Sequence, residues 1–224
     1  MQKKQKESET KKGITLLQEN ILKSSKEVNK RKNMVEKKTG KEKKSFMIKL
    51  VLIGDGAVGK TSIRRKYLGE GFVKEHLATL GADFAVKETT IDGDSIKFQI
   101  WDIAGQEFFK RVRSRFYRGC FGALAIFDLT RRETFTNLST WLEELYQNNG
   151  RGVIPVIILG NKSDLPNQEI SEEEIAKFVD DLNKKTKEKG VENFFLKTSA
   201  KTGVNIDKAF AIIGNYIVKK FEDE

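Results

Sequence analysis

The sequence predicts an α/β fold: a doubly wound, mainly parallel six-stranded sheet with one antiparallel edge hairpin. From residue 46 onward, short apolar runs alternate with stretches of helical pattern. Most of the runs are almost continuously apolar, as expected for parallel strands that helices cover on both faces. Two runs are joined by Asp92-Gly93-Asp94, which is a hairpin-turn signal.

The predicted strands are justified in chain order by these runs. They are FMIKLVLIG (46–54), ADFAVKETTI (82–91), SIKFQIWDI (95–103), GALAIFDL (122–129), VIPVIILG (153–160) and NFFLKTSA (193–200). Between the later strands, TFTNLSTWLEELYQ (134–147) and SEEEIAKFVDDLNKKTKEK (171–189) have helical patterns. The second opens with Ser171 three residues before Glu174, which predicts a capping box with acidic residues in the first turn.

Charge divides the chain into a tail and a domain. Of the net charge of +10, residues 1–46 carry +9, so the rest of the chain is almost neutral. We expect residues 1–45 to be a basic, partly helical or disordered extension, and residues 46–224 to be one domain. Ile14, Ile21, Val28 and Val35 recur every seven residues, but polar residues at the partner positions disfavour a stable coiled coil.

The extension has several possible roles, and three are left open. It could be a solvated tail, a basic amphipathic helix that weakly contacts an anionic membrane, or a helix that docks on a partner. Nucleic-acid binding is not expected, because no aromatic residues interleave with the basic ones.

Composition also limits where the protein acts. The sequence contains no run long enough for a transmembrane helix and no secretory signal peptide, and its end, IVKKFEDE, offers no cysteine for a prenyl anchor. Cys120 is the single cysteine and lies in an apolar run, so it is expected in the core rather than in catalysis. We expect a cytoplasmic monomer, at most peripheral on a membrane.

The stretch GDGAVGKT, residues 54–61, matches the phosphate-binding loop pattern and predicts a P-loop NTPase. Its glycines let backbone N–H groups converge on phosphate oxygens, at the positive end of the following helix. Lys60 supplies a charge for the β and γ phosphates, and Thr61 can bind Mg²⁺. The expected phosphate-binding residues are Asp55, Gly56, Ala57, Val58, Gly59, Lys60, Thr61 and Ser62.

A second motif, WDIAGQ, ends a predicted strand at residues 101–106. Asp102 at the end of a strand beside a phosphate loop is placed to hold Mg²⁺ through a water, although it could simply cap a turn. Gly105 lets the backbone approach the terminal phosphate, and Gln106 can face the attacking water.

Two loops predict which base is bound. A carboxylate at Asp164, in Asn161-Lys162-Ser163-Asp164, can accept hydrogen bonds from N1–H and the 2-amino group of guanine. Adenine would leave that carboxylate unpaired, which discriminates strongly. Backbone N–H groups of Ser199-Ala200-Lys201 can donate to the guanine O6. The nucleotide is therefore expected to be GTP or GDP.

These motifs, together with GADF, KFQIWDIAGQE, FYRG and TSAKTG, resemble the small GTPases of the Ras superfamily, most closely the Rab branch, over residues 46–220. The resemblance implies that Thr79 completes the Mg²⁺ shell when the γ-phosphate is present. It also implies that Phe72 packs against guanine, Lys162 lies over the base and ribose, and Gln106 orients the attacking water. Gly56 leaves room for that glutamine.

The resemblance also implies a partner surface. Effector, exchange and activating proteins would bind the two switch segments, residues 72–80 and 104–118, and the aromatic residues Phe84, Trp101 and Phe116. Two positions depart from the family pattern: His76 replaces a tyrosine, and Phe108 replaces an arginine. Three arginines after the catalytic segment, Arg111, Arg113 and Arg115, are expected to form an exposed partner-binding face.

The sequence thus predicts a GTP-binding regulatory switch that hydrolyses GTP slowly, recruits effectors and acts in membrane trafficking. The first alternative is a nucleotide-binding interaction module of the same fold with negligible hydrolysis. The second is a phosphate-transferring enzyme such as a nucleotide kinase, against which the guanine-reading loop and the lack of an arginine-rich lid argue.

Overall fold

The structure is a computed structural model that describes residues 43–71 and 79–223. Contacts divide the chain into two units, Met1–Lys43 and Lys44–Glu224. The helix and the membrane contact predicted for the extension lie outside the described residues, as do Phe72 and His76. Within the described residues no helix is both long and apolar enough to cross a membrane.

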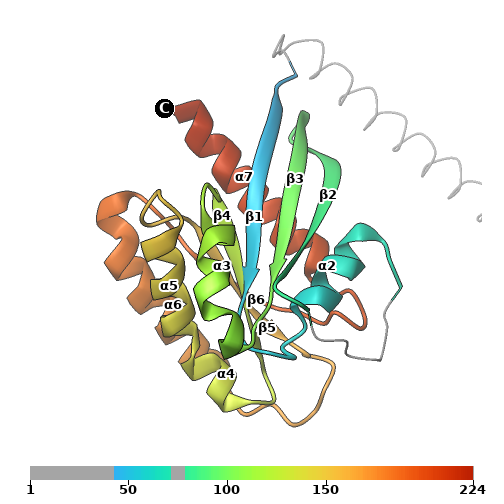
Figure 1. Cartoon of the computed structure of the whole chain (residues 1–224), viewed down its shortest axis with the longest axis vertical. Coiled ribbons are helices and arrows are strands. Elements are labelled where there is room, and N and C mark those ends of the chain that lie inside the picture. Colours follow the sequence, from blue (N-terminus) through green and yellow to red (C-terminus); the bar gives the residue numbers. More distant parts are fainter. Residues whose placement is uncertain (1–42, 72–78, 224) are drawn as a thin grey trace, which may run out of the picture. The chain divides into compact units, whose positions relative to one another are not determined.

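The described chain forms a six-stranded sheet in the order β2-β3-β1-β4-β5-β6 (Figure 1). All neighbouring strands in it are parallel except β2 and β3. This sheet confirms the predicted fold class and all six predicted strands, whose ends differ by a few residues. The strands are β1 (Ser45–Ile53), β2 (Ala82–Ile91), β3 (Asp94–Ile103), β4 (Gly122–Asp128), β5 (Val156–Asn161) and β6 (Phe194–Lys197).

The antiparallel edge hairpin is closed by a two-residue turn. Ile91 pairs with Asp94, which leaves Asp92 and Gly93 as the turn residues. Their φ angles are 50° and 94°, and positive φ at both positions is what a type I′ turn requires. The buried Asp94 carboxylate accepts a hydrogen bond from the Lys44 N–H at 3.0 Å, which fastens the start of β1 to the turn.

Helices cover both faces of the sheet (Figure 1). The predicted helix over 134–147 is two helices that meet at Asn137, whose side chain donates a hydrogen bond to Asp55 in the phosphate loop. The predicted helix over 171–189 is one α-helix followed by a short 3-10 helix. The helices are α2 (Lys60–Leu68), η1 (Glu107–Phe109), α3 (Lys110–Tyr117), α4 (Arg132–Thr136), α5 (Leu138–Asn148), α6 (Glu172–Thr186), η2 (Lys187–Lys189) and α7 (Ile206–Asp223).

The capping box predicted at the start of α6 is present. The Ser171 hydroxyl accepts a hydrogen bond from the Glu174 N–H, and the Glu174 carboxylate accepts one from the Ser171 N–H. We expect Ser171→Ala to lower the free energy of unfolding by about 1 kcal/mol, because an N–H of the first turn loses its acceptor. Urea unfolding at a fixed excess of GDP measures this. Ser139→Ala, at an exposed position inside α5, is the matched control, and an equal loss there would contradict the cap.

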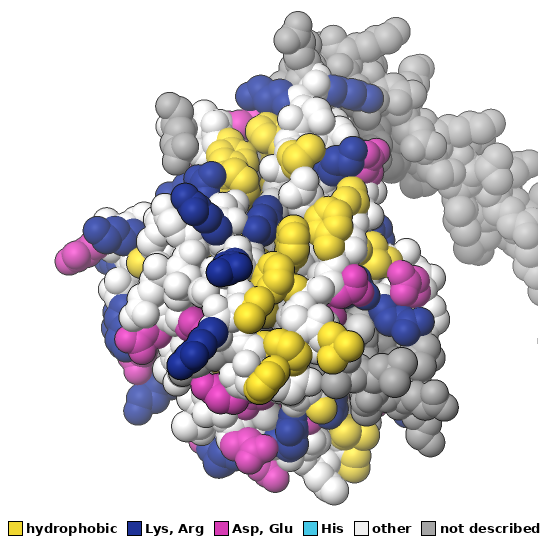
Figure 2. Space-filling model, in the orientation of Figure 1, with side chains coloured by type: hydrophobic (Ala, Val, Ile, Leu, Met, Phe, Trp, Pro, Cys, Tyr) yellow, Lys and Arg dark blue, Asp and Glu magenta, His cyan; other side chains and the backbone are white. Residues whose placement is uncertain are grey.

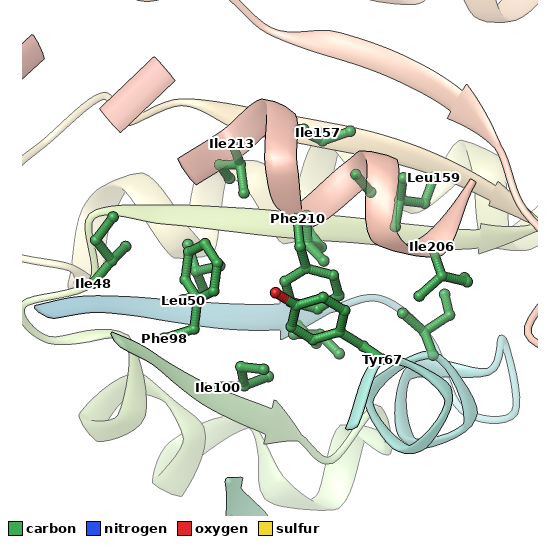
Figure 3. Close-up of a cluster of buried hydrophobic side chains, with 14 of the residues drawn as sticks. Ile48, Leu50, Tyr67, Phe98, Ile100, Ile157, Leu159, Ile206, Phe210 and Ile213 are labelled. Carbon is green, nitrogen blue, oxygen red and sulfur yellow. The ribbon is translucent and has the colours of Figure 1, made fainter. Parts of the chain in front are cut away.

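The core has two layers, because successive residues of a strand face opposite sides of the sheet. Leu50 and Leu52 of β1 pack on the side covered by α2 and α7. Figure 3 shows this side, where Tyr67 of α2 stacks on Phe210 of α7 with ring centroids 3.6 Å apart. Val51 and Ile53 pack on the side of α3, α5 and α6.

Cys120 belongs to the second layer of the core and is fully buried. Burial raises the pKa of its thiol to about 12, so the reactive thiolate is disfavoured. This confirms the prediction that the single cysteine is a core residue.

Candidate nucleotide-binding site

The predicted phosphate, metal and base residues come together at one edge of the sheet. In parallel strands all carboxyl ends lie on the same side, and this is where α/β folds bind ligands. The phosphate loop follows β1, Asp102 lies near the end of β3, Asp128 ends β4 and Asn161 ends β5. Thr198 and Ser199 follow β6 directly, so the fourth loop starts at the same edge.

The phosphate loop takes a shape that excludes side chains at two glycines. A Cβ on Gly54 would lie 2.0 Å from the Ile126 carbonyl oxygen, and one on Gly59 would lie 2.2 Å from the Asn161 amide nitrogen. Both glycines also have positive φ, at 132° and 102°. The loop is therefore pressed between β4 and the end of β5, with its backbone leading into the N-terminus of α2.

Lys60 opens α2 and folds back over the phosphate loop. Its ammonium group donates hydrogen bonds of 2.7 Å to the carbonyl oxygens of Gly54 and Asp55. Burial lowers the pKa of Lys60 to about 8, against the opposite influence of the Asp102 and Asp55 carboxylates. A cation that is buried without full compensation is suited to anionic phosphates.

Three oxygen-bearing side chains meet beside this lysine. The Thr61 hydroxyl donates to Asp102 Oδ2 at 2.5 Å and lies 3.0 Å from the Thr79 hydroxyl. Asp102 is fully buried, its Oδ1 has no hydrogen-bond partner within the described chain, and burial raises its pKa. Hydroxyl and carboxylate oxygens suit Mg²⁺, and the orphaned Oδ1 lacks the partner that a metal-bound water would provide. The residues therefore fit the predicted magnesium site.

This cluster contains too few protein ligands to hold a metal alone. Among the described residues no group of three or more His, Cys, Asp or Glu side chains could bind a metal ion. A site of two hydroxyls and one carboxylate depends on further oxygens, and Mg²⁺ commonly takes these from substrate phosphates.

The second predicted switch segment packs tightly on the phosphate loop. A Cβ on Gly105 would lie 2.4 Å from the carbonyl carbon of Asp55 and 2.6 Å from the Gly56 nitrogen. The buried Gln106 Oε1 has no hydrogen-bond partner in the part of the chain that is described. A Cβ on Gly56 would meet no described atom within 4 Å, so space is left at this point of the loop.

The end of the site that is predicted to bind the base is braced by Asn161. Its amide group donates to the Val58 carbonyl at 2.8 Å and accepts from the Ala200 N–H at 3.1 Å. The exposed Asp164 accepts a 2.6 Å hydrogen bond from the Ser199 hydroxyl through Oδ1. The phosphate loop, the loop after β5 and the loop after β6 are thus joined, and Lys201 lies exposed in the last of them.

Sequence reasoning missed two residues at this edge, Asp128 and Arg131. The buried Asp128 carboxylate accepts from Lys162 Nζ at 2.6 Å and from Arg131 Nε at 3.1 Å. Arg131 in turn donates to the Gly56 carbonyl at 2.8 Å. The position of Asp128 at the end of an apolar strand, like that of Asp102, was a signal that could have found it.

The prediction that three arginines form an exposed face is wrong for the central one, Arg113. Arg111 and Arg115 are exposed, but only 2% of Arg113 is accessible. In a helix, residues four apart share a face, whereas a residue two positions from each lies on the opposite face. Arg113 therefore points toward α5, where it pairs with Glu144.

The three aromatic residues predicted to bind partners lie in one row. The ring centroids of Phe84 and Trp101 are 5.0 Å apart, and those of Trp101 and Phe116 are 5.7 Å apart. Figure 2 shows hydrophobic side chains gathered in a band across this view of the molecule. Exposed large hydrophobic residues of β1, β2, η1 and α3 include Met47, Phe84, Val86, Phe108 and Val112.

A strand-loop-helix motif of the phosphate-binding pattern, joined to the carboxylate-bearing loop that is predicted to bind guanine, is the arrangement expected of a guanine-nucleotide-binding P-loop protein. A sequence model of the Ras family matches residues 49–219. Over 173 residues, the chain is 40% identical to the Ras-related protein RABA4a of Arabidopsis thaliana, an alignment that covers 77% of this chain and 72% of the relative. The chain therefore belongs to the Ras family and lies near its Rab branch.

Family membership makes this protein a small GTPase that acts as a regulatory switch. Proteins of the Ras family bind GTP or GDP together with Mg²⁺, and they work through effector, exchange and activating proteins.

Proposed function

We propose that this protein is a Rab-like switch in membrane trafficking, which hydrolyses GTP slowly and recruits effectors in its GTP-bound form. The observation that carries the proposal is the meeting of Thr61, Thr79 and Asp102 beside the phosphate loop. Thr79 comes from the first switch segment, so its place in this cluster supports a segment that becomes ordered around the metal and the γ-phosphate.

The phosphates and the metal would be held by the loop after β1 and its neighbours. Backbone N–H groups of residues 55–62 and the Lys60 ammonium would bind the phosphates, helped by the positive end of α2. Thr61 and Thr79 would hold Mg²⁺ directly and Asp102 would hold it through a water. When bound, Mg²⁺ neutralises the charge that develops on the phosphates.

Guanine would be recognised by the two loops that Asn161 braces. The Asp164 carboxylate would accept from N1–H and the 2-amino group, while it keeps the hydrogen bond from Ser199. Lys162, held in place by Asp128, would cover the base, and the N–H groups of Ser199, Ala200 and Lys201 would donate to O6. Phe72 would complete this end of the site.

Hydrolysis would depend on Gln106. Its carboxamide oxygen has no partner among the described residues, so it is available to accept a hydrogen bond from the attacking water. The N–H of Gly105 would bind the γ-phosphate, and Lys60 would stabilise its charge. Of the arginines near the site, Arg113 is committed to Glu144 and Arg131 to Asp128, so intrinsic hydrolysis would be slow. An arginine supplied by an activating protein would accelerate it by about 10³–10⁵.

Effectors would bind the aromatic row of Phe84, Trp101 and Phe116 and the switch segments on either side. Phe108 is 89% exposed, so this chain presents a large apolar side chain on the second switch segment. Contiguous exposed apolar surface is typical of protein-binding sites. Phe108 would therefore favour partners with a complementary apolar pocket.

Single-turnover hydrolysis tests the proposed function. We expect the wild type, loaded with GTP and Mg²⁺, to release phosphate slowly to water, and Gln106→Leu to slow that release by about ten- to a hundredfold through misplacement of the water. Gln147→Leu, at an exposed position of α5, is the matched control and should hydrolyse like the wild type.

The possible outcomes separate the candidate functions. If the wild type binds GTP tightly but releases no phosphate, the protein is a nucleotide-binding interaction module and the proposed hydrolysis is wrong. Transfer of the phosphate to an added nucleotide or protein instead of water would indicate a kinase and would overturn the proposal.

A further inference from the structure

A buried ion pair joins the helix of the second switch segment to α5. The Arg113 guanidinium donates two hydrogen bonds of 2.6 Å to the two carboxylate oxygens of Glu144. Only 3% of the Arg113 side chain and 11% of the Glu144 side chain are exposed. A two-pronged pair of this kind fixes both the distance and the orientation of its partners, which a single contact does not.

The same pair reaches both ends of the segment. Tyr117, the last residue of α3, donates its hydroxyl hydrogen to Glu144 at 3.1 Å. The Arg113 guanidinium also donates to the backbone carbonyl of Gln106 at 3.4 Å. Gln106 and Tyr117 are eleven positions apart, so this one ion pair sets the place of the whole segment on α5.

The contacts continue to the phosphate loop. The Arg113 guanidinium lies over the ring of Trp141, 4.1 Å from its centroid, as in a cation–π interaction. The indole N–H of Trp141 donates to Asp55 Oδ1 at 2.7 Å, and Asn137 donates to Asp55 Oδ2 at 2.8 Å. An unbroken chain of contacts therefore runs from Gln106 through Arg113 and Trp141 to the residue after the first glycine of the loop.

Stability alone does not account for this arrangement. Removing two charges from water is costly, and buried ion pairs can often be replaced by apolar residues with no loss of stability. Here the pair replaces simple apolar packing with a directional clamp at the segment that carries Gln106. Because both prongs of Arg113 are engaged by Glu144, its guanidinium is also not available to the γ-phosphate.

We infer that Arg113 is a positioning residue for GTP hydrolysis, which, clamped by Glu144, holds Gln106 at a set place relative to the phosphate loop. This inference rests on the proposed function, because it concerns the rate of the hydrolysis proposed above. In this role Arg113 acts through the backbone of Gln106 and through the contact of Trp141 with Asp55, and not directly on the nucleotide or the water.

Two variants separate positioning from folding. Arg113→Lys keeps the charge but loses the two-pronged geometry. The triple variant Arg113→Met, Glu144→Met, Tyr117→Phe removes the pair together with the hydroxyl bound to it, so it leaves no buried partner of the pair unpaired. The matched control is Lys208→Met, which removes an exposed basic side chain from α7, outside the switch segments. For each protein, single-turnover hydrolysis, GTP and GDP affinity and the unfolding temperature are measured in the full chain.

We expect both variants to hydrolyse GTP about ten- to a hundredfold more slowly than the wild type, with GTP and GDP affinities within a few fold and cooperative unfolding retained. The control should match the wild type in all three measurements. A folded triple variant that hydrolyses at the wild-type rate would show that the pair only fills space. Should the triple variant fail to fold, wild-type hydrolysis by Arg113→Lys overturns the inference in the same way. A wild type that binds GTP but releases no phosphate would overturn the proposed function, and this inference with it.

Discussion

Replacing Asp164 with asparagine is expected to change the base preference of the site. The affinity for GTP should fall, and that for xanthosine triphosphate should rise. The asparagine amide presents one donor and one acceptor where the carboxylate presents two acceptors. Its NH₂ group would face the 2-amino group of guanine, but it can donate to the 2-oxo group of xanthine. We expect GTP affinity to fall by about a hundredfold, which corresponds to about 3 kcal/mol.

The substitution is suited to this position because it leaves the local contacts intact. The asparagine oxygen can still accept the hydrogen bond that Ser199 donates to Asp164 Oδ1. Competition against a fluorescent nucleotide measures both affinities, with Asp180→Asn on the exposed side of α6 as the control. Unchanged GTP affinity in Asp164→Asn would mean that the base is bound elsewhere.

Gly105→Ala is expected to prevent the second switch segment from closing on the phosphate loop. The added Cβ would lie within 2.6 Å of backbone atoms of Asp55 and Gly56, and backbone in this braced loop cannot move aside. The segment must therefore shift away, and Gln106 moves with it. We expect single-turnover hydrolysis to slow by about a hundredfold and the preference for GTP over GDP to decrease, while GDP still binds.

Gly71→Ala provides the matched control. The backbone φ of Gly71 lies outside the left-handed region, and an added Cβ would meet no described atom within 4 Å. Affinities for GTP and GDP, together with single-turnover hydrolysis, distinguish the two variants. Wild-type hydrolysis by Gly105→Ala would show that the close packing seen between the segment and the loop is not the form in which the protein acts.

Features encoded by short stretches of sequence were predictable. Every strand follows from its own apolar run, and the turn at Asp92 and Gly93 follows from two residues with the right conformational freedom. The residues that meet around Thr61 were predictable as well. The motifs of Thr61 and Asp102 stand at the ends of the parallel strands β1 and β3, and the sheet brings those ends together, whereas Thr79 was expected only from the family resemblance.

Features that depend on distant partners were not predictable. The break between α4 and α5 falls at Asn137, whose side chain binds Asp55 about eighty positions earlier in the chain. Arg113 reads as one more charge in a basic stretch, and its burial depends on Glu144, thirty-one positions away. Pairings of this kind become visible only when the helices are packed side by side.

The two-residue turn at the end of the edge hairpin has a consequence for the proposed partner surface. The register of β2 on β3 sets Phe84 directly opposite Trp101, which is the eighth pair of the ladder counted from the turn. In such a ladder, a slip of one residue moves every side chain of the strand to the other face. One residue inserted between Asp92 and Gly93 would therefore shift β2 by one position along β3. The residue opposite Trp101 would then no longer be Phe84, and the Phe84 side chain would lie on the other face of the sheet. The composition of the surface that we propose for effector binding is therefore set by a turn at the far end of the hairpin.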